Sequence, residues 1–498
     1  MRPAFGGVSL FLNVYLIVGH RSSTYADRDR LESSIMIRKF VEDLRSEARS
    51  VFTLAWPLVL AEIGWMAMGI VDTIMVGHLP NSAEAIGGVS LGSVIFYTAA
   101  IFGGSLLFSL DTKVSQSFGA GDLADANHSL LNALYIIVPL VPVLMAMVWL
   151  AGHLLPGMGV GPAILSKALP FLRAMNWSTP PLLLYFAFRR YLQAVNLVKP
   201  VTFALVSANL VNLLGDWVLI YGHLGLPAFG VAGSGWSTCS SRIYLAVVLF
   251  VTVVWQHRKK KLRLFQPPLI PDLARIRELL RIGLPAATQI LFEIGVFATV
   301  TALIAKLDAA SLAAHQIALN CASLTYMVPL GISSAAAVRV GQAIGRRDPA
   351  GAGRAGWTAI MMGAGFMSIA ALALVLAPRL IVRIFTPDPQ VMRIGVKLLL
   401  VAAAFQLFDG LQSVATGALR GAGETRIPML SSFVAYWVVG LPLGYYLGFN
   451  RGLGALGLWM GLALSLMFIG SALMLAWRWK VGQLVEAQGE ALNAARTF

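Results

Sequence analysis

The chain has 498 residues, of which 57% are hydrophobic and only 12% charged, and its formal net charge is +15. Soluble domains carry about twice that share of charged residues, so a soluble fold of this size could not bury so much apolar surface. The basic residues gather in alternate loops between apolar runs, as in membrane proteins, and do not form a nucleic-acid-binding surface. We therefore expect an all-α polytopic membrane protein with no nucleic-acid partner.

The sequence carries none of the usual marks of a cofactor or an enzyme. Cys239 and Cys321 both lie inside apolar runs, so we expect neither a disulfide framework nor a structural metal site. No glycine-rich run is followed by Lys and then Ser or Thr, so we expect no P-loop ATPase site in this chain. No His/Cys/Asp metal cluster and no Ser/Lys dyad stands out either. Any transport should therefore draw on an ion gradient.

Twelve apolar windows are long enough to cross a bilayer as helices, because about 20 residues span its hydrocarbon core. The windows are 52–77, 86–111, 129–150, 166–187, 201–221, 231–255, 282–305, 312–337, 355–377, 393–418, 428–449 and 454–477.

The distribution of basic residues predicts the orientation. With both termini in the cytoplasm, 28 of the 38 Lys and Arg residues fall in cytoplasmic segments, which is the positive-inside pattern. The basic N-terminal leader 1–47 is predicted to lie in the cytoplasm. Its residues 8–18 are apolar but too few to span the bilayer. Met36 opens a conventional leader, so we hypothesise that residues 1–35 lie upstream of the natural start.

The most informative pattern is an internal duplication. Residues 113–126 and 339–352 share a basic residue, Val, Gln, Gly, Asp, Ala and Ala in the same order, and each segment follows a long apolar run. Each half is predicted to cross the membrane an even number of times, so both halves enter it from the same side. The repeat is therefore parallel, with the two halves related by an axis along the membrane normal, as in many secondary transporters. We expect Asp122 and Asp348, in these repeated loops, to cap helices. The predicted parts are the N-lobe 48–256, a cytoplasmic linker 257–280, the C-lobe 281–480 and a cytoplasmic tail 481–498.

Four acids stand well inside predicted spans, namely Asp72, Asp216, Glu293 and Asp409. A charged side chain there costs about 2.5–3.5 kcal/mol on insertion scales, so it normally faces an interior cavity and has a function. A carboxyl group removed from water can exchange a proton near neutral pH, or bind a small or organic cation in its charged form. Competition between these two partners is a physical basis for exchange. The alternative for each acid is a structural hydrogen bond between helices.

Each acid has polar or aromatic neighbours at helical spacing. Among the further candidates for cation or substrate binding are Asn209, Asn212, Gln289 and Gln412, with Trp65, Phe292, Phe405 and Glu62 as candidate substrate contacts. The aromatic residues would add cation–π attraction for a flat lipophilic cation. We interpret Arg242, midway along the sixth span, as a structural counter-charge and not a substrate ligand.

These motifs together resemble the MATE (multidrug and toxic compound extrusion) family. The resemblance rests on M-G-I-V-D-T-I-M-V-G at 68–77, the paired Lys/Arg-Val-x-Gln-x-x-Gly segments and L-R-G-A-G-E-T-R-I-P at 419–428. The pair Glu293 and Asp409 resembles the NorM branch. The resemblance implies a bacterial inner-membrane antiporter that expels lipophilic, often cationic drugs in exchange for H⁺ or Na⁺. It also implies that Asp72, Glu293 and Asp409 bind ion or substrate, with transient Na⁺ at the last two.

Glu62 departs from the family, where Gln is expected, and leaves the coupling stoichiometry open. Two alternatives also stay open. One is a lipid-linked oligosaccharide flippase of the same superfamily, although these commonly have fourteen spans and a basic central cavity. The other is a non-transporting membrane scaffold. We expect no bound cofactor beyond the coupling ion, and a monomer surrounded by membrane lipids.

Overall fold

The computed structural model describes the backbone of residues 26–260 and 270–496, which is mostly helical and contains no strand within these ranges. Ala48–Phe498 form one compact unit, and Met1–Glu47 form another. The hypothesis about residues 1–35 falls mainly on residues outside the described part. The helices are α2 (Ala26–Gly77), α3 (Ser82–Leu106), α4 (Ser109–Gly119), α5 (Leu123–Leu154), η1 (Leu155–Met158), α6 (Pro162–Asn176), α7 (Thr179–Ala194), α8 (Val198–Tyr221), α9 (Val231–Lys260), α10 (Leu273–Ile304), α11 (Ala309–Gly345), α12 (Pro349–Leu376), α13 (Pro378–Phe385), α14 (Pro389–Gly421), α15 (Arg426–Ser432), η2 (Phe433–Gly440), α16 (Leu441–Tyr445), η3 (Tyr446–Asn450) and α17 (Ala455–Arg496).

Eleven helical segments of the described chain are long and apolar enough to span a membrane. The predicted fourth span is the exception, because it is divided between α6 and α7 at Trp177 and Ser178. The cause is local. Pro180 and Pro181 lack the N–H groups that would continue α6, so they open a new helix instead. The polypeptide still passes through all twelve predicted windows.

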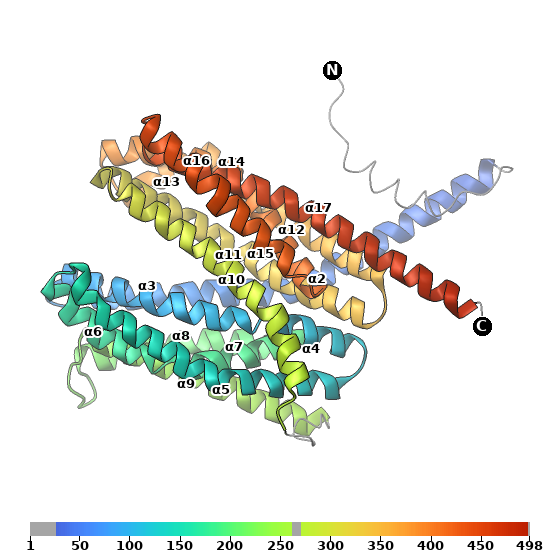
Figure 1. The fold of residues 1–498 in the computed structure, drawn as a ribbon, viewed down its shortest axis with the longest axis horizontal. Helices are drawn as coiled ribbons and strands as arrows, with labels where there is room; N and C mark the ends of the chain where they lie inside the picture. Colours follow the sequence, from blue (N-terminus) through green and yellow to red (C-terminus); the bar gives the residue numbers. More distant parts are fainter. Residues whose placement is uncertain (1–25, 261–269, 497–498) are drawn as a thin grey trace. The chain divides into compact units, whose positions relative to one another are not determined.

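The helices form two bundles that correspond to the two halves of the sequence (Figure 1). In the N-terminal half α8 packs on α9 and α3 on α6, and in the C-terminal half α14 packs on both α11 and α17. Each half has its own hydrophobic core, but the first helix of each half contributes to both. Val51 and Leu58 of α2 belong to the C-terminal core, whereas Leu279 and Ala287 of α10 belong to the N-terminal core.

The duplicated segments are largely helical, which corrects the expectation that they form loops. Their first seven residues are the last turns of α4 and α11, which end at Gly119 and Gly345. The predicted caps that follow are confirmed. Asp122 accepts a hydrogen bond from the Asp125 N–H over 2.9 Å at the start of α5, and Asp348 accepts one from the Gly351 N–H over 2.7 Å at the start of α12. Both caps satisfy amides that a helix end leaves without acceptors.

The segment predicted as a linker is partly helical. Helix α9 extends to Lys260 and α10 already begins at Leu273, where Asp272 accepts hydrogen bonds from the Ala274 and Arg275 amides. The predicted tail is likewise helical as far as Arg496, as the last part of α17.

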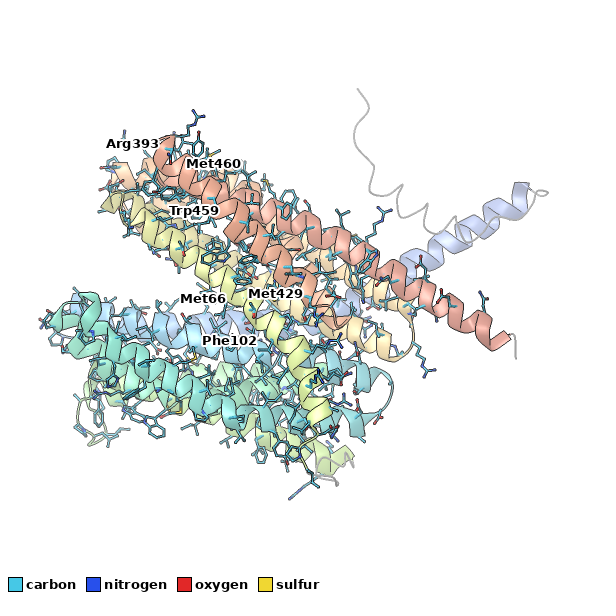
Figure 2. The ribbon with its side chains drawn as sticks, viewed as in Figure 1. Met66, Phe102, Arg393, Met429, Trp459 and Met460 are labelled. Atoms are coloured by element: carbon cyan, nitrogen blue, oxygen red, sulfur yellow. The ribbon has the colours of Figure 1, made fainter. Side chains whose placement is uncertain are left out.

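Figure 2 shows Met66 and Phe102 on helices of the N-terminal half, with Trp459 among the helices of the C-terminal half.

Candidate functional site

In the N-terminal half, α2 and α8 bring two of the predicted acids together. Asp72 and Asp216 lie side by side and are buried, with Asn212 also beside Asp72. The hydroxyl of Thr238 on α9 donates a hydrogen bond to Asp72 Oδ2 over 2.9 Å. Both carboxyl oxygens of Asp216 lack a hydrogen-bond partner among the described residues. Two adjacent buried carboxyl groups favour a proton or a cation between them, so this pair has the chemistry of an ion site.

Asn209 lies on α8 one turn before Asn212 and is only partly buried. Its side-chain amide donates to the Leu205 carbonyl of its own helix over 2.9 Å. The predicted polar stripe on α8 therefore divides into an outer residue bound to its own backbone and an inner pair, Asn212 and Asp216, that faces α2 and α9.

A fixed positive charge accompanies the N-terminal acids. The fully buried Arg242 of α9 donates to Ser178 Oγ over 2.5 Å and to the Tyr97 hydroxyl over 3.1 Å. Its guanidinium carbon lies 5.7 Å from the centre of the Trp65 ring, and Asp72 lies within its electrostatic reach. These contacts support the interpretation of Arg242 as a structural counter-charge. Trp65 itself stacks on Tyr185 with ring centres 5.9 Å apart, so its ring is already occupied by protein.

Glu62 is paired within the N-terminal half and does not stand free as an extra acid. It is 8% exposed, and its carboxylate forms a salt bridge with the guanidinium of Arg189 on α7. Arg189 also donates to the Tyr185 hydroxyl over 3.3 Å. An acid held this way has its charge already compensated, so the structure gives Glu62 a structural partner where the sequence suggested a substrate contact.

In the C-terminal half, α10 and α14 bring the other two acids together. Glu293 and Asp409 are electrostatic neighbours, and the hydroxyl groups of Tyr326 and Tyr436 lie near both. Tyr436 donates to Gln412 Oε1 over 3.3 Å. Among the described residues, neither acid belongs to an ion pair. Among the described residues, the C-terminal acids thus form a pair without a salt-bridge partner, with polar side chains around it.

A small cavity of about 40 Å³ reaches this cluster. Glu293, Gln289 and Gln412 line it from the C-terminal half, and Phe108 lines it from the N-terminal half. Asp409 is 8% exposed and does not line the cavity. Drug-sized ligands occupy cavities of about 300–1,000 Å³, whereas one or two water molecules or a bare cation fit in a few tens. In this conformation the cavity suits an ion or water.

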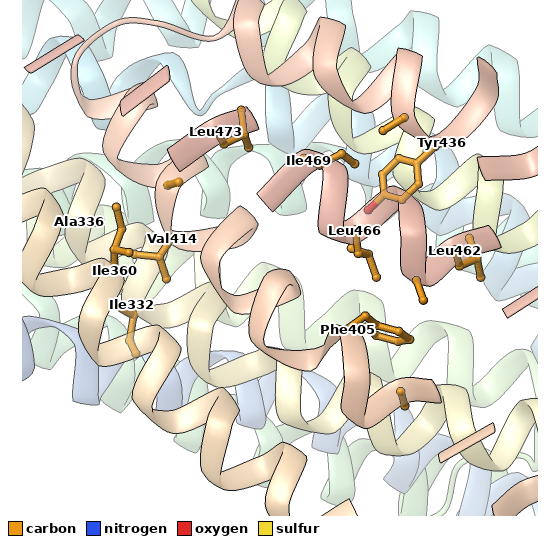
Figure 3. Close-up of a cluster of buried hydrophobic side chains, with 14 of the residues drawn as sticks. Ile332, Ala336, Ile360, Phe405, Val414, Tyr436, Leu462, Leu466, Ile469 and Leu473 are labelled. Atoms are coloured by element: carbon orange, nitrogen blue, oxygen red, sulfur yellow. The ribbon is translucent and has the colours of Figure 1, made fainter. Parts of the chain in front are cut away.

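The two predicted aromatic contacts of the C-terminal half pack elsewhere. Phe405 is 3% exposed and lies in the hydrophobic core against Trp459, with ring centres 6.0 Å apart. Figure 3 shows it near Leu462 and Leu466 in that core. The ring of Phe292 packs against Phe433 at 5.1 Å. Neither residue lines the cavity. Helix α14 is apolar on more than one face, so spacing alone could not tell the core face from the cavity face.

The sequence reasoning missed a buried ionic cluster that joins the two halves. Asp111 of α4 is fully buried and lies 3.1 Å from Arg190 of α7 and 3.5 Å from Arg420 of α14. Both guanidinium groups also cover the Phe108 ring, at 4.1 and 4.3 Å from its centre. The available signal in the sequence is Asp111 itself, an acid at the end of an apolar window.

Next to this cluster the duplicated motif forms a reciprocal contact. Gln116 Nε2 donates to the Gly421 carbonyl over 3.1 Å, and Gln342 Nε2 donates to the Ala194 carbonyl over 2.8 Å. A Cβ atom on Gly119 would lie 2.1 Å from the Gln342 carbonyl oxygen, and one on Gly345 would lie 2.0 Å from the Gln116 carbonyl oxygen. We call this set, Gln116, Gly119, Ala194, Gln342, Gly345 and Gly421, the clasp. Each repeat therefore uses its Gln and Gly to bind the opposite half.

Comparison with known proteins agrees with this geometry. The MatE family model matches residues 57–218 and again residues 285–446, which confirms the duplication. A probable multidrug resistance protein NorM of Mesorhizobium japonicum is 35% identical over 440 residues, covering 87% of this chain and 94% of the relative. Its counterpart in Brucella suis is 34% identical over 434 residues, covering 85% and 91%.

The fold is also found among solved structures. The crystal structure of the eukaryotic MATE transporter AtDTX14 superposes with a TM-score of 0.77 at 20% identity, covering 90% of this chain and 100% of that one. The family match extends over both halves, and the multi-pass helical fold, the duplication and the NorM-like relatives all agree with it. The chain belongs to the MatE family.

Proposed function

We propose that this protein is an antiporter that exports lipophilic, often cationic drugs in exchange for H⁺ or Na⁺. The observation that carries the proposal is the pair Glu293 and Asp409, because two neighbouring acids that form no ion pair with any described residue attract a cation. Glu293 lines the cavity between the halves, so a cation there is accessible to the transport route. The curated relatives named as multidrug resistance proteins support drugs as the cargo.

Alternating access of the two halves is the second part of the proposal. The clasp and the Asp111 cluster hold the halves together at one end of the helices, and the cavity of about 40 Å³ cannot admit a drug-sized molecule. A cargo of that size would therefore require the halves to move apart. Most of each hydrophobic core comes from one half, with α2 and α10 contributing to both, so the halves can move relative to each other largely as bodies.

The proposed orientation follows from the basic residues. The clasp lies at the end of the helices where Arg190 and Arg420 occur, and the positive-inside pattern assigns this end to the cytoplasm. In this arrangement the described conformation is closed toward the cytoplasm. Cation binding from outside would neutralise Glu293 and Asp409 and release the drug, and drug binding from the cytoplasm would later displace the cation.

The test is ethidium efflux from cells that express the protein, with the proton and sodium gradients collapsed separately. Exchange is then measured in proteoliposomes for the wild type and for Asp409→Asn. We expect efflux to stop when one of the two gradients is removed, and the variant to lose drug–cation exchange. Undiminished exchange by the variant would remove Asp409 from the mechanism, and efflux that ignores both gradients would refute the antiport proposal.

Asp388→Asn is the matched control. Asp388 is an exposed acid that caps α14 by accepting hydrogen bonds from the Gln390 and Val391 amides, and Asn caps a helix about as well. The control removes one carboxylate from the same helix as Asp409 while leaving the cavity untouched. A general sensitivity of α14 to loss of charge would lower exchange in both variants.

A further inference from the structure

A second and larger hollow is lined by residues 49–57 of α2, by the start of α8 and by residues near the ends of α9 and α11. It has a volume of about 650 Å³. Three of the residues that line it are basic, namely Arg49 at the start of the first span, Lys199 in the first turn of α8 and Arg339 near the end of α11. Among the described residues that line it, none is acidic. We call this hollow, with its three basic residues, the basic groove.

We propose that the basic groove binds a phosphate group, supplied by an anionic phospholipid of the adjoining membrane leaflet. Arg49 and Lys199 are exposed basic residues at one hollow, and an anion bound between them is attracted to both. Basic pockets between membrane helices on the cytoplasmic side bind phospholipid headgroups through the same chemistry. The volume exceeds what a phosphate group alone fills, so a glycerol backbone also has room.

The backbone of α8 adds donors to the groove. Leu197 precedes this helix, and no side chain there accepts a hydrogen bond from the first-turn amides. The start of a helix carries a partial positive charge and unsatisfied N–H groups, which favour phosphate. Leu197 and Lys199 both line the groove, so this helix start adds to the charge of the basic side chains.

Exposed aromatic residues flank the groove. On α2 the rings of Phe52 and Trp56 are 56% and 54% exposed and stack on each other, next to the groove residues Thr53 and Pro57. Trp255 of α9 is 54% exposed and adjoins Gln256, which also lines the groove. Tryptophan gathers where headgroups meet acyl chains. A lipid is therefore the favoured source of the phosphate.

Occupation of the groove would act on the clasp. Asn196 lines the groove, and its Oδ1 accepts a hydrogen bond from Gln342 Nε2 over 3.0 Å. Lys199 and Arg339 belong to different halves, so an anion that contacts both binds best while the halves are closed at this end. A ligand that prefers one conformation shifts the equilibrium toward it. The lipid would thus stabilise the clasped state.

The test uses the full-length protein in detergent and measures thermal unfolding together with bound lipid by native mass spectrometry. The additions are phosphatidylglycerol, phosphatidylcholine and inorganic phosphate, each alone. The variant is the double substitution R49Q/K199Q, and the control is R478Q, which removes an exposed basic residue of α17 near the same end. Each basic residue near an anionic surface contributes about 1 kcal/mol, so the double variant should bind phosphatidylglycerol about 30-fold more weakly.

We expect phosphatidylglycerol to raise the unfolding temperature of the wild type and of R478Q, but not of R49Q/K199Q. Inorganic phosphate alone could instead raise the unfolding temperature of the wild type and not of R49Q/K199Q. That result would support the phosphate site, with a soluble anion as its source. Equal binding of phosphatidylglycerol by all three proteins would overturn the proposal, as would an equal response to phosphatidylcholine. The measurement involves no transport, so its result is independent of the proposed antiport.

Discussion

The two halves of the molecule derive from one repeat, yet they treat their buried acids differently. In the N-terminal half Asp72 receives a hydrogen bond from Thr238 and lies within electrostatic reach of Arg242, and Glu62 is paired with Arg189. In the C-terminal half Glu293 and Asp409 lie near tyrosine hydroxyls, Glu293 lines the cavity, and neither acid forms an ion pair with a described residue. The difference teaches that a carboxylate in a membrane helix is more available for a cation where no basic side chain offsets its charge.

The largest effect should follow from removing charge on the uncompensated side. We expect Glu293→Gln to weaken cation binding about 30-fold or more, because loss of a buried charged partner costs about 2–5 kcal/mol. Asp72→Asn should change the same affinity by less than about fivefold, since the positive charge of Arg242 already offsets the N-terminal acids. Cation-dependent quenching of tryptophan fluorescence in the purified protein gives both affinities. Equal losses in the two variants would end the distinction between the halves.

The N-terminal half can be made to resemble the C-terminal half by removing the positive charge of Arg242. Arg242→Gln leaves Asp72 and Asp216 without a counter-charge and takes charged donors from Ser178 and Tyr97. We expect a loss of about 3 kcal/mol in stability, as for other broken buried charge pairs. The double variant R242Q/D72N should regain part of it, because removing one negative charge along with the positive one restores the wild-type net charge of the group. Thermal unfolding measures both, and a double variant no more stable than R242Q would show that Arg242 acts only through Ser178 and Tyr97.

Much of the fold and part of the site could be predicted from the sequence. Helical spacing correctly placed Asn212 and Asp216 on one face, and long apolar windows gave the spans. Pairing across the structure could not be predicted, because the partners of Glu62 and Asp111 lie 127 and 79 residues away along the chain. The role of the repeated Gln also needed the structure. The sequence shows that Gln116 and Gln342 recur, but only the structure shows that each donates a hydrogen bond to a backbone carbonyl of the opposite half.

The clasp gives a symmetric test, because both halves contribute equally to it. Gly119→Ala and Gly345→Ala would each place a Cβ atom about 2 Å from a backbone oxygen of the other half. We expect each to cost about 1–3 kcal/mol and to part the halves at this end, since backbone cannot yield as a flexible side chain can. Gly365→Ala is the control, because nothing lies within 4 Å of its Cβ position. Thermal unfolding should show similar losses of stability in the two clasp variants and no change in the control. A clasp variant as stable as the wild type would show that the two halves do not contribute equally to the clasp.

The smallest effect concerns the turns that enter the second helix of each half, where the halves again differ. Asp308 accepts hydrogen bonds from the Ser311 N–H over 2.8 Å and from the Ser311 hydroxyl over 2.7 Å, whereas Asn81 has φ 59° and makes no side-chain cap bond. The bonds from Ser311 hold the pKa of Asp308 below its ordinary value of 3.8. The ionised cap therefore stabilises the fold fully above the unfolded-state pKa, and this stability is lost as pH falls through the lower folded pKa.

Asp308→Ala should cost about 0.5 kcal/mol near neutral pH, at the low end for a helix cap because solvent screens this exposed group. The cost should shrink in acid below the ordinary pKa, where the unfolded carboxyl is protonated and the advantage of the ionised cap declines. Asn81→Gly should cost nothing, because glycine adopts the positive φ of that turn and no cap bond is lost. Unfolding measured against pH separates the two turns. A pH-independent cost at Asp308 would mean that its packing, and not its charge, supports α11.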